Sequence, residues 1–207
     1  MIIDAGFLSE WQYKGHRYGE CMSHQDSKYM YVYIPKNASS WTKPNLKDFE
    51  WEFYNYHTDK LDKHALVVLR DPVERWVSGI AEYFTLYHPD FSTWTTDVFD
   101  LVFDRICFDD HTQQQVKFLH GLDTDKCTFF NFTNYRENFG CWIAEHFGKN
   151  KYDRYEYQHV SELSPDRKKI KEIFNQQLQN SKYLEQVKNY YTNDYELINQ
   201  VKFYGTR

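Results

Sequence analysis

Apolar side chains in this chain gather in short runs that predict three β-strands in its first third. Residues 29–34 (YMYVYI) are apolar throughout and are followed by Pro35, so they predict a short buried strand. Residues 49–56 (FEWEFYNY) alternate aromatic with acidic or polar side chains over much of their length, which is the period of a strand with one exposed face. Residues 65–69 (ALVVL) are aliphatic without a break, as in a parallel strand that is covered on both faces.

The residues after the third strand change to a helical pattern. Asp71 can cap a helix that begins at Pro72, and Glu74 stands three residues after the cap, as in a capping box. We therefore expect a helix from Pro72 to about Tyr87. Further segments are predicted from their patterns: a helix near 95–106, a strand at 127–132, a helix near 135–147 and a helical tail from Pro165 onward.

Strands that alternate with helices predict an α/β fold. We expect one domain over residues 1–207, with a mainly parallel central sheet flanked by helices. In a sheet of this kind the ligand site lies at the carboxyl ends of the strands, so the residues that follow each strand are the first to consider.

Composition and charge narrow the classes of function. The 207 residues are 41% apolar and include only 8 Gly and 5 Pro, which fits one folded core and excludes a disordered or linker-rich chain. The longest apolar run has six residues, far fewer than a membrane span requires, and the first residues lack a signal-peptide layout. We expect a soluble, cytoplasmic protein without a membrane partner.

Two further partners are set aside on charge and cysteine spacing. The net charge is −5 and the basic residues are scattered, so a nucleic-acid partner is not expected. The four cysteines lie far apart without a CxxC pair, which predicts free, mostly buried thiols and no metal site. They are Cys21, Cys107, Cys127 and Cys141.

A small polar loop, KNASS at 36–40, directly follows the first strand. A lysine, an amide and two hydroxyls at this place, together with successive backbone N–H groups, can surround a phosphate or sulfate group. The loop is not the Walker pattern, because it has no glycine and its lysine precedes the small residues. An ordinary surface turn is the alternative for a loop of this composition.

The segment LRDPVERWVS at 69–78 offers a second anion site. Arg70 ends the aliphatic strand, and Ser78 lies two turns into the helix on the same face as Arg75. An arginine grips phosphate oxygens with two N–H groups, so Arg70 and Ser78 could hold a second phosphate. The alternative is that Arg70 forms an ion pair with Asp71 or Glu74.

Taken together, the two segments resemble the sulfotransferases that use 3′-phosphoadenosine 5′-phosphosulfate. IPKNASSW is similar to the 5′-phosphosulfate loop of that family, and LRDPVERWVS is similar to its 3′-phosphate motif, with arginine at the strand end and serine eight residues later. The RDPxxRxxS form resembles the carbohydrate sulfotransferases most. Weaker similarity continues through residues 109–119, the strand-like segment from 127 and residues 189–198, so it covers most of the chain.

The resemblance implies a P-loop-like sulfotransferase fold, a sulfuryl donor and a set of site residues. Lys36 would stabilise the charge that develops on the leaving phosphate, and no metal is required. Trp41 would stack on the adenine, although a buried core tryptophan is an equal alternative. The acceptor would be a hydroxyl, expected on a carbohydrate. The implied donor-binding residues are Lys36, Asn37, Ala38, Ser39, Ser40, Trp41, Arg70 and Ser78.

Transfer to a hydroxyl also needs a base that takes the acceptor's proton, and histidine suits this task. His57 is the first choice, because it follows the second strand and would emerge at the carboxyl edge beside Lys36. His64 and His111 are alternatives, as is a carboxylate such as Glu50 or Glu52.

Some features depart from the family pattern or leave the function open. Pro44 soon after the loop predicts that the following helix is very short, and the glycine-rich basic segment of the cytosolic relatives is missing.

Two other functions are considered. A nucleotide-binding module without catalysis is the main alternative to a sulfotransferase, and a related kinase is the second alternative. The aromatic residues Tyr83, Phe84, Tyr87, Phe91 and Trp94 either line a sugar-binding cleft or pack in the core. The oligomeric state is not readable.

Overall fold

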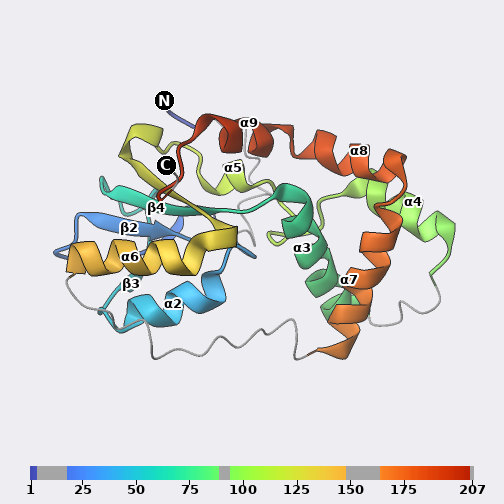
Figure 1. Cartoon of the computed structure of the whole chain (residues 1–207), viewed down its shortest axis with the longest axis horizontal. Helices are drawn as coiled ribbons and strands as arrows, with labels where there is room; N and C mark the ends of the chain where they lie inside the picture. Colours follow the sequence, from blue (N-terminus) through green and yellow to red (C-terminus); the bar gives the residue numbers. More distant parts are fainter. Residues whose placement is uncertain (4–17, 89–93, 148–163, 206–207) are drawn as a thin grey trace.

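A computed structural model describes residues 1–3, 18–88, 94–147 and 164–205 of the chain. These residues form one α/β domain around a five-stranded sheet with the order β3-β1-β2-β4-β5 (Figure 1). The strands are β1 (Glu20–Ser23), β2 (Tyr29–Val32), β3 (Glu52–Asn55), β4 (His64–Leu69) and β5 (Cys127–Asn131).

The sheet is mixed rather than mainly parallel. β4 runs parallel to both of its neighbours, β2 and β5, whereas β1 pairs antiparallel with both β2 and β3. The carboxyl ends of β2, β4 and β5 therefore meet at one edge, as a ligand site of this fold class requires. The sequence analysis missed β1, because its four residues, ECMS, form a strand only through their pairing with distant partners.

The strand predictions are confirmed in place; three strands are shorter than predicted, and β4 begins one residue earlier, at His64. The aliphatic run of β4 is covered on both faces: Ala65, Val67 and Leu69 point into one core cluster, and Leu66 and Val68 into another. Its side chains are at most 2% exposed from Ala65 to Leu69, which explains why the run has no polar position.

Helices cover both faces of the sheet, and a further group of helices packs beside it. In Figure 1, α5 and α9 lie along one face and α2 and α6 along the other, while α3, α4, α7 and α8 gather beside the sheet. The bounds are α2 (Ser39–Lys47), α3 (Pro72–Tyr87), α4 (Thr96–Arg105), α5 (Gln115–Phe118), α6 (Tyr135–Phe147), α7 (Pro165–Gln177), α8 (Ser181–Tyr190) and α9 (Thr192–Gln200), with short 3₁₀ turns at Thr124–Lys126 and Phe132–Asn134.

The helix after β4 begins as its sequence predicts. The Asp71 carboxylate accepts a hydrogen bond from the Glu74 N–H at 2.9 Å, and Pro72 is the first helical residue. α2 differs from the prediction, because it continues for nine residues with Pro44 inside it. Proline removes one backbone hydrogen bond, and the burial of Trp41 and Leu46 on the same helix offsets this loss.

The aromatic residues of the central third pack mainly against one another. Phe84 is 6% exposed, its ring centroid lies 4.5 Å from that of Trp94, and both contact Phe174 of α7. Tyr87 is 63% exposed, and Phe91 lies outside the described residues. The core interpretation therefore holds for Phe84 and Trp94.

Two other expectations are met in part. All four cysteines are free, but only Cys21 is buried, since Cys107 and Cys127 are half-buried and Cys141 is exposed. Among the described residues, no helix combines the length and the apolar character needed to cross a bilayer.

Candidate functional site

The loop between β2 and α2 has the backbone shape of an anion-binding turn. Lys36 and Ala38 both adopt left-handed conformations, with φ of 67° and 60°. Ala38 takes the N-cap position of α2 and offers no side-chain hydrogen bond to the first turn. The Asn37 N–H, between these two residues, donates to the Ile34 carbonyl oxygen at 3.2 Å, and the N-terminal N–H groups of α2 have no side-chain cap, as in an anion-binding helix start. Ser39 and Ser40 are the first two residues of that helix.

Arg70 connects the second predicted segment to this loop. Its Nη1 donates a hydrogen bond to the Lys36 carbonyl oxygen at 3.3 Å, and its guanidinium lies 4.2 Å from the centre of the Phe132 ring. The ion pair with Glu74 is also present, with Nε 3.6 Å from Oε2, but Glu74 is 66% exposed and this pair contributes little. The structure thus brings Lys36 and Arg70 together, as the two segments predicted.

The Lys36 ammonium lies among positive charges and, within the described residues, contacts one carboxylate. It forms an ion pair with Glu82 of α3, whose Oε2 also lies 3.8 Å from Nη1 of Arg167. Burial, and then the charges of Arg167, Lys171, Arg70 and Arg75, lower the pKa of Lys36 to about 7. The contact with the Glu82 carboxylate acts in the opposite direction and favours the charged ammonium.

Arg167 and Lys171 are site residues that the sequence analysis did not identify. They stand four apart on α7, beside the buried Ile170 and Phe174 that pack this helix into the core. Arg167 is 9% exposed, and its Nε is buried with no hydrogen-bond partner among the described residues. A buried guanidinium N–H without a partner fits a site that receives an anion.

Three of the predicted donor-binding residues are buried. Asn37 is fully buried, and its Nδ2 donates to the Val68 carbonyl at 2.7 Å and to Gln115 Oε1 at 2.6 Å. Trp41 is 7% exposed and packs edge to face against Tyr135 at 5.6 Å, which is the core alternative. Ser78 is 8% exposed, and its hydroxyl makes no hydrogen bond within the described part of the chain.

Two cavities adjoin the loop and Arg70. One of about 430 Å³ lies between Ala38 and the segment 132–137, and one of about 150 Å³ is lined by Arg70 together with Asn131 and Tyr195. Phe132 and Thr133 line both cavities. The cavity beside the loop and the cavity beside Arg70 therefore share part of their lining.

Among the described residues, no hydrogen bond or ion pair joins His57 to Lys36. β1 lies between β2 and β3, and two strand spacings amount to roughly 10 Å. The His57 ring contacts Tyr56 at 4.3 Å and His120 at 6.4 Å, and its Nε2 is buried without a hydrogen-bond partner in the described residues. Burial, followed by the charge of His120, lowers the pKa of His57.

The other candidate bases also differ in position. His64 is the first residue of β4, at the edge opposite to Lys36, and its Nε2 pairs with Thr128 Oγ1 at 2.8 Å. Glu50 and Glu52 are exposed. His111 is the candidate that reaches the charged group, because its Nε2 lies 3.8 Å from Oε1 of Glu82.

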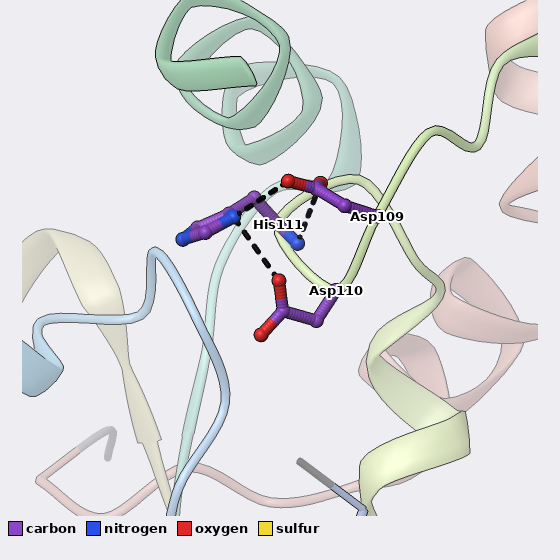
Figure 2. A group of neighbouring side chains, drawn as sticks. All are labelled: Asp109, Asp110 and His111. Carbon is purple, nitrogen blue, oxygen red and sulfur yellow. Dashed lines mark hydrogen bonds and ion pairs between the residues drawn. The ribbon is translucent and has the colours of Figure 1, made fainter. Parts of the chain in front are cut away.

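His111 is fixed by two carboxylates of its own loop. Figure 2 shows its imidazole with Nδ1 directed at Asp109, at 2.9 Å, and at Asp110, at 3.1 Å. Burial lowers the pKa of His111, but the hydrogen bonds to Asp109 and Asp110 raise it more, so the pKa lies above its usual value. The loop lies close against α3, where a Cβ at Gly79 would be 2.7 Å from the carbonyl carbon of His111.

Comparisons of the chain with protein-family models, with curated proteins and with solved structures gave no match, so its function is argued from the site itself.

Proposed function

We propose that this protein is a sulfotransferase that moves a sulfuryl group from 3′-phosphoadenosine 5′-phosphosulfate to a hydroxyl acceptor, on a carbohydrate. The observation that carries the proposal is the hydrogen bond from Arg70 to the Lys36 carbonyl, which joins the two expected phosphate-binding segments at one sheet edge. These segments were identified separately in the sequence, and they follow two strands, β2 and β4, that are parallel neighbours in the sheet.

The charges at this edge support a donor with several negative groups. Lys36, Arg70, Arg167 and Lys171 are close enough for the other three to lower the pKa of Lys36. Glu82 is the carboxylate in contact with Lys36 and Arg167. Positive charge concentrated in a partly buried site attracts phosphate and sulfate more strongly than the same charge in water does.

Each residue of the site then has a role that its position allows. Backbone N–H groups of the loop and of Ser39 and Ser40 bind the 5′-phosphate at the start of α2. Lys36 stabilises negative charge on the leaving phosphate. The bound donor supplies an activated sulfuryl group, and the protein orients it and neutralises charge. Arg70 and Ser78 hold the 3′-phosphate, and the adjoining cavity beside Ala38 accommodates the nucleoside.

The test begins with binding of the desulfated product. Adenosine 3′,5′-bisphosphate at about 1,000 times its dissociation constant should stabilise the protein by roughly 4 kcal/mol, while ADP and ATP with magnesium should not. Radiolabelled sulfate transfer to a panel of hydroxyl acceptors follows. Lys36→Ala should abolish transfer, and Lys28→Ala, an exposed lysine at the opposite end of β2, serves as the matched control.

The outcomes separate the possible functions. Binding of the bisphosphate without any transfer would favour a nucleotide-binding module, and stabilisation by ATP with magnesium alone would favour a kinase. A Lys36→Ala protein with full transfer activity would contradict the role given to this lysine.

A further inference from the structure

A hydroxyl acceptor must lose its proton during transfer, and the arrangement around His111 identifies a group that can take it. We propose that His111 is the catalytic base of this site and that Asp109 and Asp110 hold its imidazole in the required tautomer. This inference rests on the proposed sulfotransferase function and replaces His57 in the role that the sequence suggested for it.

Two carboxylates fix the direction of the His111 imidazole. Both carboxylates accept from Nδ1, at 2.9 Å from Asp109 and 3.1 Å from Asp110, so the proton of the neutral ring stays on Nδ1 (Figure 2). The lone pair is then on Nε2, which is the atom that faces Glu82. A carboxylate that fixes the tautomer of a histidine in this way leaves the other nitrogen ready to accept a proton.

The Nε2 atom of His111 lies next to the charged group around Lys36. It lies 3.8 Å from Oε1 of Glu82, too far for a hydrogen bond, and the other oxygen of the same carboxylate contacts Lys36. His111 and Lys36 are therefore separated by one carboxyl group. A base and a charge-stabilising lysine need this proximity, because both act on atoms of the same transfer.

His57 differs from His111 in exposure and in neighbours. The side chain of His111 is 24% exposed. The Nε2 atom of His57, in contrast, is buried and has no hydrogen-bond partner in the described residues. A base must touch the acceptor hydroxyl within hydrogen-bond distance. Among the described residues, His57 contacts Tyr56, Asn55 and His120, and none of these belongs to the charged group around Lys36.

The reaction step balances as a direct substitution. The acceptor oxygen forms a bond to sulfur as the bond from sulfur to the phosphate oxygen breaks, and that electron pair remains on the phosphate. The acceptor's proton passes to Nε2 of His111, whose positive charge is then stabilised by Asp109 and Asp110. Lys36 faces the charge that develops on the leaving phosphate.

Charged groups from several elements surround this imidazole and set its titration. Asp109 and Asp110 belong to its own loop, Glu82 and Arg75 to α3, Lys36 to the loop after β2, and Arg167 and Lys171 to α7. The pKa of His111 lies above its usual value. The rate of transfer should accordingly rise with pH along an acid limb whose midpoint is above 6.5, as the imidazolium loses its proton.

The decisive experiment compares His111→Asn with His57→Asn. Asparagine keeps a donor near the position of Nδ1 and removes the base, so His111→Asn should lower transfer by about 10²–10⁴-fold and remove the acid limb. It should retain the thermal shift with adenosine 3′,5′-bisphosphate, which shows that the protein is folded and binds the nucleotide. His57→Asn should keep both the rate, within about threefold, and the limb.

Two further measurements test the role of His111 if the His111→Asn protein does not fold. In Asp109→Asn, which removes a negative charge from Nδ1, the acid limb should move to lower pH. In the NMR titration of the wild-type imidazoles, the His111 signal should show a pKa above 6.5, and binding of the dianionic bisphosphate groups should raise it further.

The outcomes distinguish this inference from the function on which it rests. If the wild type neither binds the bisphosphate nor transfers sulfate, the sulfotransferase proposal falls and the base assignment with it. If the wild type transfers sulfate and His111→Asn does so equally well, the function stands and the role of His111 is overturned. Loss of transfer in His57→Asn alone would return the role to His57.

Discussion

The side-chain amide of Gln115 pairs with both backbone groups of Arg70. The Arg70 N–H donates to Oε1 at 3.0 Å, and Nε2 donates to the Arg70 carbonyl at 2.9 Å. The same Oε1 accepts from Nδ2 of Asn37 at 2.6 Å. Gln115 is the first residue of α5 and is 1% exposed, so one buried amide fixes the loop after β2 and the end of β4 relative to each other.

We predict that Gln115→Leu destabilises the protein and weakens nucleotide binding together. The substitution leaves the buried donors of Asn37 and Arg70 without their acceptor, at a cost of about 2–4 kcal/mol in the free energy of unfolding. Urea denaturation measures this loss. Gln179→Ala is the matched control, because Gln179 is exposed and bonds only within its own turn, so a similar loss there would contradict the assignment.

A second prediction concerns Arg75, which is fully buried on α3. Its guanidinium donates to the carbonyl oxygens of Pro35, at 3.0 Å, of Asp110, at 3.2 Å, and of Gln113. It therefore holds the loop before Lys36 and the loop that carries His111. A lysine cannot donate the three hydrogen bonds that the planar guanidinium makes in three directions. For Arg75→Lys we therefore expect a loss of about 3 kcal/mol in the free energy of unfolding.

The control for this substitution is Arg105→Lys, in the last turn of α4. Arg105 donates to the Cys107 carbonyl in an exposed position, so its replacement should change stability by less than about 0.5 kcal/mol. Equal stability of the Arg75→Lys protein and the wild type in a thermal melt would show that the three carbonyl contacts do not need the guanidinium.

The sequence predicted the elements whose signals are complete within a few residues. β4 is a continuous aliphatic run that meets two cores, and the start of α3 has its cap, its proline and its acidic residue in order. β1 has no such signal, since ECMS contains two polar residues among four. Its strand conformation comes from pairing with β2 and β3, which a local pattern does not contain.

The candidate site also contains residues that the sequence pattern brings together and residues that only tertiary packing brings together. Lys36 and Arg70 follow strands that are neighbours in the sheet, so their meeting follows from the pattern of the strands. Glu82, Arg167 and His111 join them through the packing of α3, α7 and a loop, and no spacing in the sequence relates these three. His57 was expected beside Lys36 because β1, the strand that separates them, was not recognised.

A third prediction tests how closely the His111 loop lies against α3. In Gly79→Ala, the added Cβ would lie 2.7 Å from the His111 carbonyl carbon and 3.2 Å from Cγ2 of Thr112. Backbone has to move, so we expect a loss of about 1–3 kcal/mol in unfolding free energy and a displaced His111. Gly140→Ala, within α6, should instead gain about 0.5–1 kcal/mol from helix propensity. Destabilisation of both proteins to the same extent would contradict the close approach.

The last prediction concerns Glu82, which occupies the cation group where the donor's anionic groups are proposed to bind. Glu82→Gln removes the carboxylate that contacts Lys36 and Arg167 while keeping its size. Where pH is low enough for the Lys36 ammonium to be charged in both proteins, affinity for adenosine 3′,5′-bisphosphate should increase on the order of tenfold in the variant. Titration calorimetry at several pH values measures the change.

The gain in affinity should fade as pH rises. Burial and the neighbouring cations lower the pKa of Lys36 to about 7 with Glu82 in place, and Glu82→Gln removes a carboxylate that opposes them. A lysine is charged below its pKa, so the variant should lose the ammonium, and with it the added affinity, at a lower pH than the wild type does. The wild type should lose the ammonium as pH rises through about 7. Glu74→Gln removes a carboxylate that is 66% exposed and should alter affinity less than about twofold. Weaker binding by Glu82→Gln at every pH would mean that this carboxylate builds the anion site instead of competing for it.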